Sequence, residues 1–258
     1  MKYKFVFDEG YLGDFYVELS KEEIKVVLIT LAGGHNVMLS GYKTERLAKA
    51  IKLLRDLNNP FIDVAPNCTD RQLIGIYNSN GLKQGFVTDA NNGYLHMVDL
   101  ARSKCDVTNW LHTVMCNGWI KLCYSFNTKT LPAKFQLIAE TNSICKNYEF
   151  RNVLKLCDVV YKCKEEDKRE LYSIAELKHK LETLRECHND VAKELDIPNI
   201  CNRDIENIEQ ALLSKSGKEV QQGLNCNIKT IRVARTLADM YMHFHTFSTD
   251  VEEALLYS

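Results

Sequence analysis

The sequence predicts an α/β fold: a parallel sheet flanked by helices, followed by an all-helical C-terminal domain. Apolar, strand-like runs alternate with helical patterns up to about Cys163, and charged helical sequence dominates after it. We expect the α/β core to span residues 1–165 and the helical domain residues 166–258. A chain of 258 residues is long enough for one large domain or two modest ones.

The first predicted elements are a helix over 20–32, a strand over 36–40 and a helix over 44–57. Ser20 and Glu23 have the spacing of a capping box, which marks the start of the first helix. Apolar residues at helical spacing predict the second helix, which follows the strand after a very short turn.

Three further strands and a hairpin are predicted in the middle of the chain. A turn at Asn92-Gly93 precedes a buried strand over 94–98. An alternating strand turns at Asn127-Thr128 and leads into a buried strand over 135–139, which predicts a hairpin at about 118–134. A last short strand is expected near 156–162.

The C-terminal part predicts helices near 204–214, 228–242 and 249–257. Thr249 and Glu252 have capping-box spacing at the start of the last one.

Composition excludes several classes of protein. A formal net charge of −1 gives no global attraction to nucleic acid or to an anionic membrane, so nucleic acid is not favoured as a partner. The longest apolar run, Val26 to Ala32, is far shorter than a membrane span, and the first residues contain no apolar signal core. We therefore expect a cytoplasmic protein.

The 10 cysteines are scattered and form no CxxC pair, so the residues predict no metal site. We interpret the cysteines as small buried side chains in a reducing compartment.

Residues 36–46 have the order of a phosphate-binding loop: strand, glycine, Lys-Thr, helix. In a working GxxxxGK[ST] loop, five residues separate the first glycine from the lysine, and backbone N–H groups curl around the phosphates. Here only Tyr42 separates Gly41 from Lys43, and Glu45 brings a carboxylate to the first helical turn, where a phosphate would bind. Two interpretations stay open: an ordinary strand–turn–helix connection, or weak anion binding through Gly41, Lys43 and Thr44.

Six strings resemble, in the same order, segments of the AAA+ ATPases of the magnesium-chelatase subunit I family, most closely its competence-protein branch. They are AGGHNVMLSG (32–41), PFIDVAPNCTDRQLIG (60–75), NGYLHMVDLA (92–101), LPAKFQLIAETN (131–142), IRVARTLADMY (231–241) and EEALLY (252–257). The resemblance implies an AAA+ type parallel sheet with a helical lid, and ATP with Mg²⁺ as the family's cofactors. It also implies an AAA+ partner or self-oligomer, because AAA+ subunits assemble into rings.

The resemblance also assigns positions for catalytic residues. The Walker B Asp-Glu pair corresponds to Val98 and Asp99, so Asp99 is either a residual cation ligand or a solvated strand end. Asn142 stands at sensor 1, where it either orients water or serves as a turn residue. The arginine-finger position holds Leu156, and the sensor-2 region holds Asn225, Cys226 and Asn227. Arg232 and Arg235 match the lid helix itself, and we expect them on the helix surface.

These departures predict a degenerate AAA+ protein: a binding, scaffold or regulatory subunit with little or no ATP hydrolysis. Each lost charge-assisted contact costs about 1.5–3 kcal/mol, and loss of an arginine finger alone removes about 10³–10⁵ in rate. One alternative is a slow ATPase that uses Lys43, Thr44, Asp99 and Asn142. The other is a nucleic-acid accessory factor, which would need a local basic face.

Overall fold

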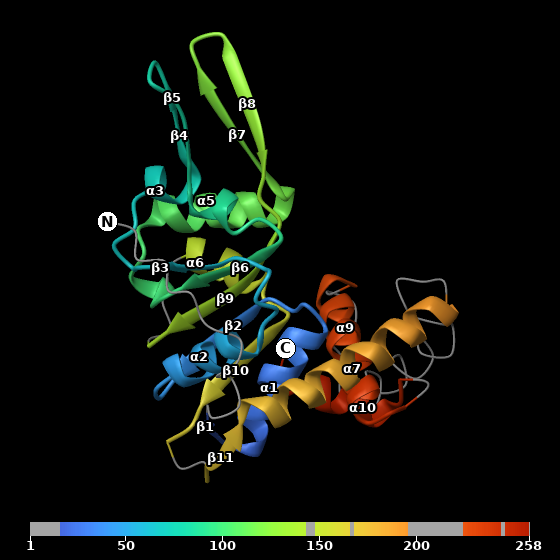
Figure 1. Ribbon diagram of the computed structural model, residues 1–258. Helices are drawn as coiled ribbons and strands as arrows, with labels where there is room; N and C mark the ends of the chain where they lie inside the picture. Colours follow the sequence, from blue (N-terminus) through green and yellow to red (C-terminus); the bar gives the residue numbers. More distant parts are fainter. Residues whose placement is uncertain (1–15, 143–147, 166–167, 196–223, 244–245, 258) are drawn as a thin grey trace.

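The computed structural model of the protein describes residues 16–142, 148–165, 168–195, 224–243 and 246–257 (Figure 1). Its centre is a sheet of five parallel strands in the order β10-β2-β9-β6-β3. The strands are β2 (Val37–Gly41), β3 (Phe61–Val64), β6 (Gly93–Met97), β9 (Phe135–Thr141) and β10 (Val159–Cys163). The predicted parallel α/β fold is therefore confirmed.

Helices cover both faces of this sheet, because alternate strand residues face two separate hydrophobic clusters. Val37, Leu39 and Ile138 face the first cluster, whereas Met38 and Leu137 face the second. The first cluster lies under α1 (Lys21–Ala32), α2 (Glu45–Leu54), α7 (Ile174–Leu195), α9 (Leu224–Met240) and α10 (Ser248–Ala254). The second lies under α3 (Asp70–Ile74), α4 (Phe86–Asp89), α5 (Cys105–Asn117) and α6 (Tyr148–Leu154).

Two hairpins project from the second face, side by side beyond α5 (Figure 1). They are β4 (Gly75–Asn78) with β5 (Gly81–Gln84), and β7 (Trp119–Tyr124) with β8 (Asn127–Pro132). The second is the hairpin predicted at about 118–134, but its turn lies at Ser125-Phe126. The predicted turn at Asn127-Thr128 is wrong, since Asn127 already pairs with Tyr124. Ser125 takes the left-handed conformation that the tight turn needs, with φ +51°.

The first helix begins as predicted. The Ser20 N–H donates to the Glu23 carboxylate (2.8 Å), and the Glu23 N–H donates to the Ser20 hydroxyl (3.2 Å), which completes the capping box.

Several predicted boundaries are displaced. The second helix ends at Leu54, three residues before the predicted limit, and β10 begins at Val159 instead of near 156. The last helix begins at Ser248, where the Asp250 carboxylate accepts from the Phe247 N–H (2.8 Å), so the predicted Thr249 capping box is wrong. The helix near 204–214 lies outside the described residues.

One pair of strands was not predicted from the sequence, and it joins residues from the two ends of the α/β core. Strand β1 (Tyr16–Leu19) pairs antiparallel with β11 (Glu170–Ser173), immediately before α7. The division at residue 165 stays a prediction.

In the described part of the chain, no helix has the length and apolar character required to cross a membrane. Among the cysteines whose side chains the structure describes, Cys68, Cys157 and Cys163 are buried. The interpretation of the cysteines as buried side chains is wrong for Cys105, Cys116 and Cys123, which are exposed.

Candidate functional site

The connection from β2 to α2 is a tight turn. Only Tyr42 and Lys43 lie between Gly41 and Thr44, and the Tyr42 N–H donates to the Cys163 carbonyl (3.2 Å). Gly41 and Lys43 both have positive φ, +94° and +50°. The Lys43 ammonium lies over the Tyr42 ring, 5.0 Å from its centroid. The backbone therefore turns on itself within two residues and docks against the end of β10.

Gly41 allows this docking, and its replacement by a larger residue should destabilise the fold. A Cβ at Gly41 would lie 2.5 Å from the Cys163 carbonyl oxygen, so Gly41→Ala should lower the free energy of unfolding by about 1–3 kcal/mol. Urea unfolding of Gly81→Ala is the matched control, because Gly81 has φ +103° but nothing within 4 Å of the added methyl. Equal losses in the two variants would contradict a close approach of β10.

A series of hydrogen-bonded polar side chains starts at Thr44 and crosses three strands of the sheet. The Thr44 hydroxyl donates to the Glu140 carboxylate (2.5 Å). The other Glu140 oxygen lies 2.6 Å from His96 Nε2, and His96 Nδ1 lies 2.8 Å from Asp63. The Lys52 ammonium contacts the second Asp63 oxygen (2.5 Å). We call these five residues the polar relay.

The polar relay lies between the sheet and α2. Asp63, His96 and Glu140 each occupy the next-to-last position of a parallel strand, in β3, β6 and β9. Since these strands are neighbours, their side chains meet near the carboxyl edge of the sheet. Thr44 closes one end: it stands at the N-cap of α2, yet its hydroxyl makes no cap hydrogen bond because Glu140 accepts it.

Charge holds the relay together. Burial of the imidazole disfavours its protonation, but the hydrogen bonds to Asp63 and Glu140 outweigh burial and raise the pKa of His96 above its ordinary 6.5. The hydrogen bond from His96, with the help of Lys52, lowers the pKa of Asp63 to about 2. Both ring nitrogens of His96 lie within hydrogen-bond distance of carboxylate oxygens, which accept, so the protonated imidazole with two N–H groups satisfies both contacts at once.

A second ionic contact fixes the start of α2. Arg46 donates to the fully buried Glu23 carboxylate (3.0 Å) and lies 6.0 Å from the centre of the Tyr42 ring. Arg169 approaches the same carboxylate (3.5 Å). The N-terminus of α2 is thereby tied to α1 and to the segment before β11.

The predicted site residues are not joined into one centre. Asp99 follows β6 in the left-handed conformation (φ +46°) and pairs with Arg102 (3.2 Å), and Val98 before it is exposed. Asn142 follows β9 and is also exposed. Over the described ranges, no hydrogen bond or ion pair links Asp99 or Asn142 to Lys43 or Thr44.

Other predicted positions are placed as follows. Leu156 lies in the turn before β10. The side chains of Asn225, Cys226 and Asn227 lie outside the described residues, although their backbone belongs to α9. Arg232 pairs with Asp158 (3.0 Å) and is half exposed, as expected of a surface arginine. Arg235 is buried against Asp239, so its predicted place on the helix surface is wrong.

Sequence reasoning missed the polar relay. The signal that could have found it is a polar residue near the carboxyl end of each of three buried strands. The relay was missed because β3 was not predicted as a strand. This strand has only four residues, and three of them are not fully buried. Without β3, Asp63 had no predicted neighbour.

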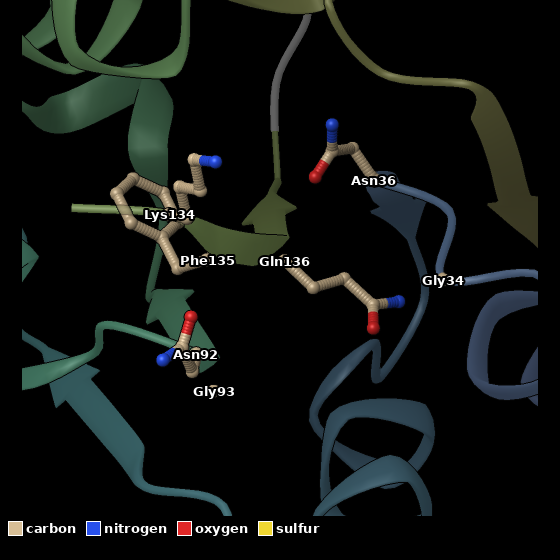
Figure 2. Close-up of a pocket in the computed structure, with 7 residues that line it drawn as sticks. All are labelled: Gly34, Asn36, Asn92, Gly93, Lys134, Phe135 and Gln136. Atoms are coloured by element: carbon tan, nitrogen blue, oxygen red, sulfur yellow. The ribbon is translucent and has the colours of Figure 1, made fainter. Parts of the chain in front are cut away.

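A hollow of about 320 Å³ lies at the opposite, amino edge of the sheet (Figure 2). Gly34, Asn36, Gly93, Lys134 and Gln136 are among its lining residues. Two of its amides already serve the fold: Gln136 donates to the His35 carbonyl (2.6 Å), and the Asn36 side-chain oxygen accepts from the Leu137 N–H (2.8 Å). Because these amides make hydrogen bonds within the fold, few polar groups of the hollow remain to bind a ligand.

Comparison with known proteins is consistent with this architecture. The family model of magnesium chelatase, subunit ChlI, matches residues 50–175, a segment that begins inside α2 and therefore after the turn at 41–44. A crystal structure of a candidate ATPase from Cytophaga hutchinsonii aligns with 93% of this chain and 81% of that chain, with a TM-score of 0.62 and 18% identity. At this identity the likeness shows the fold alone. A search of curated proteins gives no match.

Proposed function

We propose that this chain is a non-catalytic subunit of the AAA+ magnesium-chelatase-like family, with little or no ATP hydrolysis. The match of residues 50–175 to the magnesium-chelatase family model and the likeness of the fold to that of a candidate ATPase support the family. The chain would act as a binding, scaffold or regulatory subunit. One observation carries the proposal: in a working GxxxxGK[ST] loop the Ser/Thr hydroxyl holds Mg²⁺, whereas the Thr44 hydroxyl donates to Glu140. A metal would have to break this buried hydrogen bond and compete with His96, whose Nε2 lies 2.6 Å from the other Glu140 oxygen.

The geometry of the turn supports the same proposal. A phosphate cradle needs several successive backbone N–H groups that face one point. Between Gly41 and Thr44 the chain offers two residues, and one of their N–H groups is bonded to β10. The Lys43 ammonium is held over Tyr42 by a cation–π contact. An anion at this turn would have few donors to replace its hydration.

Nucleotide titration tests the proposal. We expect no saturable heat when the full chain is titrated with ADP or ATP, with and without Mg²⁺, up to millimolar nucleotide. Lys43→Ala should then behave as the parent does. Micromolar Mg-ATP binding that is lost in Lys43→Ala would contradict the proposal and favour the slow ATPase that uses Lys43, Thr44, Asp99 and Asn142.

A non-catalytic subunit needs a partner, and we propose an AAA+ protein or further copies of this chain. Sedimentation of the purified chain, alone and mixed with an active chelatase-like AAA+ subunit, measures this directly. A monomer that associates with neither would remove the scaffold role, whatever the result of the nucleotide titration.

The two projecting hairpins favour a second candidate function, that of a nucleic-acid accessory factor. Neither hairpin contains an acidic residue, although the chain as a whole carries a net charge of −1. Lys83, Lys121 and Lys129 are exposed on the hairpins, and Phe126 is fully exposed at the tip of the second. The rings of Tyr77 and Tyr124 pack together with centroids 5.9 Å apart, which joins the hairpins. Lysines interspersed with aromatic rings can bind and stack single-stranded nucleic acid.

Fluorescence anisotropy with a labelled oligothymidine tests this second candidate. If three lysines contact phosphates, the logarithm of affinity should fall with the logarithm of salt with a slope of about −2. Phe126→Ala should weaken binding by about 1–3 kcal/mol, and Lys180→Gln, on exposed α7 surface, should not. Absence of binding at low salt would remove this candidate.

A further inference from the structure

A hollow of about 370 Å³ lies at the C-terminal end of α2, against α7. It is separate from the turn at 41–44, which lies at the other end of α2. Leu54 and Leu181 contribute buried apolar surface, and Leu57 is an exposed apolar residue of the lining. The charged lining residues are Arg55, Asp56, Lys178, Glu182 and Arg185.

Arg55 donates to the Lys52 carbonyl but makes no ion pair within the part of the chain that the structure describes. Its guanidinium packs against the Phe61 ring, 5.2 Å from the centroid. Its Nε is buried with no hydrogen-bond partner in the part of the chain that the structure describes. Burial lowers the pKa of Arg55 and outweighs the opposing effects of Tyr94, Asp63 and Asp56. An anion beside this guanidinium would relieve the cost of its burial.

The other two cations have different surroundings. Arg185 is held in place by its hydrogen bond to the Leu31 carbonyl (3.3 Å) and by a hydrogen bond with the Tyr94 side chain. Lys178 is half-buried and makes no ion pair within the described ranges. Arg55 donates one hydrogen bond, to the Lys52 carbonyl, so Arg55 and Lys178 keep more donor capacity for a ligand than Arg185 does. Arg55 stands at the C-cap of α2 and Lys178 lies on α7, so the two cations approach the hollow from different elements.

The charges and the apolar surface that line the hollow indicate which class of ligand would fit it. Three cations against two carboxylates leave one net positive charge, which matches a monoanion. A multiply charged phosphate would be repelled by Asp56 and Glu182, whereas the leucines suit an apolar body. A hollow of this size falls within the range of small-molecule sites. We propose that it binds a small organic monocarboxylate, with the carboxylate between Arg55 and Lys178 and the apolar body against the leucines.

Calorimetric titration of the full chain with 2-naphthoate tests the proposal, with 2-naphthamide and inorganic phosphate as comparison probes. We expect saturable binding of 2-naphthoate only. Arg55→Gln and Lys178→Gln should each weaken that binding about tenfold or more, because each removes a charge-assisted contact. Arg71→Gln, on the exposed surface of α3, is the matched control and should leave binding unchanged.

Three results would overturn the proposal: no saturable 2-naphthoate binding, equal binding of the neutral amide, or preferential binding of phosphate. Binding that is unaffected by both pocket variants would overturn it as well. If Arg55→Gln does not fold, as judged by circular dichroism, Lys178→Gln decides, because its partly exposed side chain makes no ion pair in the described structure.

Discussion

Replacing His96 with leucine should lower the free energy of unfolding by about 3–5 kcal/mol, because the substitution breaks a buried ion pair. Glu140 would lose its cationic neighbour while it remains buried under α2, and Asp63 would keep only the exposed contact with Lys52. Leucine fills a similar volume, so the loss reports mainly the uncompensated carboxylate and only slightly a cavity.

Urea unfolding of the full chain measures this loss, and His179→Leu on the exposed face of α7 is the control. The double variant His96→Leu/Glu140→Leu should recover part of the stability, since it removes both charges at once. A loss below about 1 kcal/mol in His96→Leu would mean that water reaches Glu140 and that the relay is not a buried ionic network.

The same relay predicts how stability depends on pH. The pKa of His96 is raised in the folded protein, so its contribution is complete below about 6.5 and is lost as pH rises through the folded value. The pKa of Asp63 is lowered to about 2, so its contribution is complete above its ordinary 3.8 and is lost as pH falls toward 2. The difference in stability between the parent chain and His96→Leu should therefore be largest near pH 5 and shrink as the pH rises above 6.5. A difference that grows with pH would contradict an imidazolium at position 96.

The site could be predicted only in part from the sequence, because one of the strands that form it is very short. The runs that form β2, β6 and β9 are mostly apolar, and each was predicted within about two residues. β3 was missed, because Phe61 and Ile62 are only half-buried and Asp63 is exposed. The polar relay depends on this strand, since only the pairing of β3 with β6 brings Asp63 opposite His96.

Local sequence signals predicted the structure correctly where all the interacting residues are close together in the chain. The capping box at Ser20 needs no distant residue, and it formed as predicted. The turn of the second hairpin depends on which residues of β7 and β8 pair, and a preference for Asn127-Thr128 carries no information on that register. Arg235 was misplaced for a similar reason: a lid arginine at helical spacing does not reveal whether a neighbouring segment covers it.

Arg235→Met should lower the free energy of unfolding by about 3–5 kcal/mol, because it removes the Arg235 cation from the buried Asp239 carboxylate. Arg235 also donates to the His243 carbonyl (2.9 Å), so its removal loosens the connection from α9 to α10. Arg232→Met is the control on the same helix: its partner Asp158 is also buried but accepts a further hydrogen bond from the Asn36 N–H (3.0 Å), and Arg232 itself is half exposed, so we expect a smaller loss, about 1 kcal/mol.

The double variant Arg235→Met/Asp239→Leu separates charge burial from packing. If the uncompensated carboxylate causes the loss, urea unfolding should show the double variant to be more stable than Arg235→Met alone. If it is equally or less stable, the contacts of Arg235 with the α9–α10 connection carry the effect, and the ion pair with Asp239 is secondary.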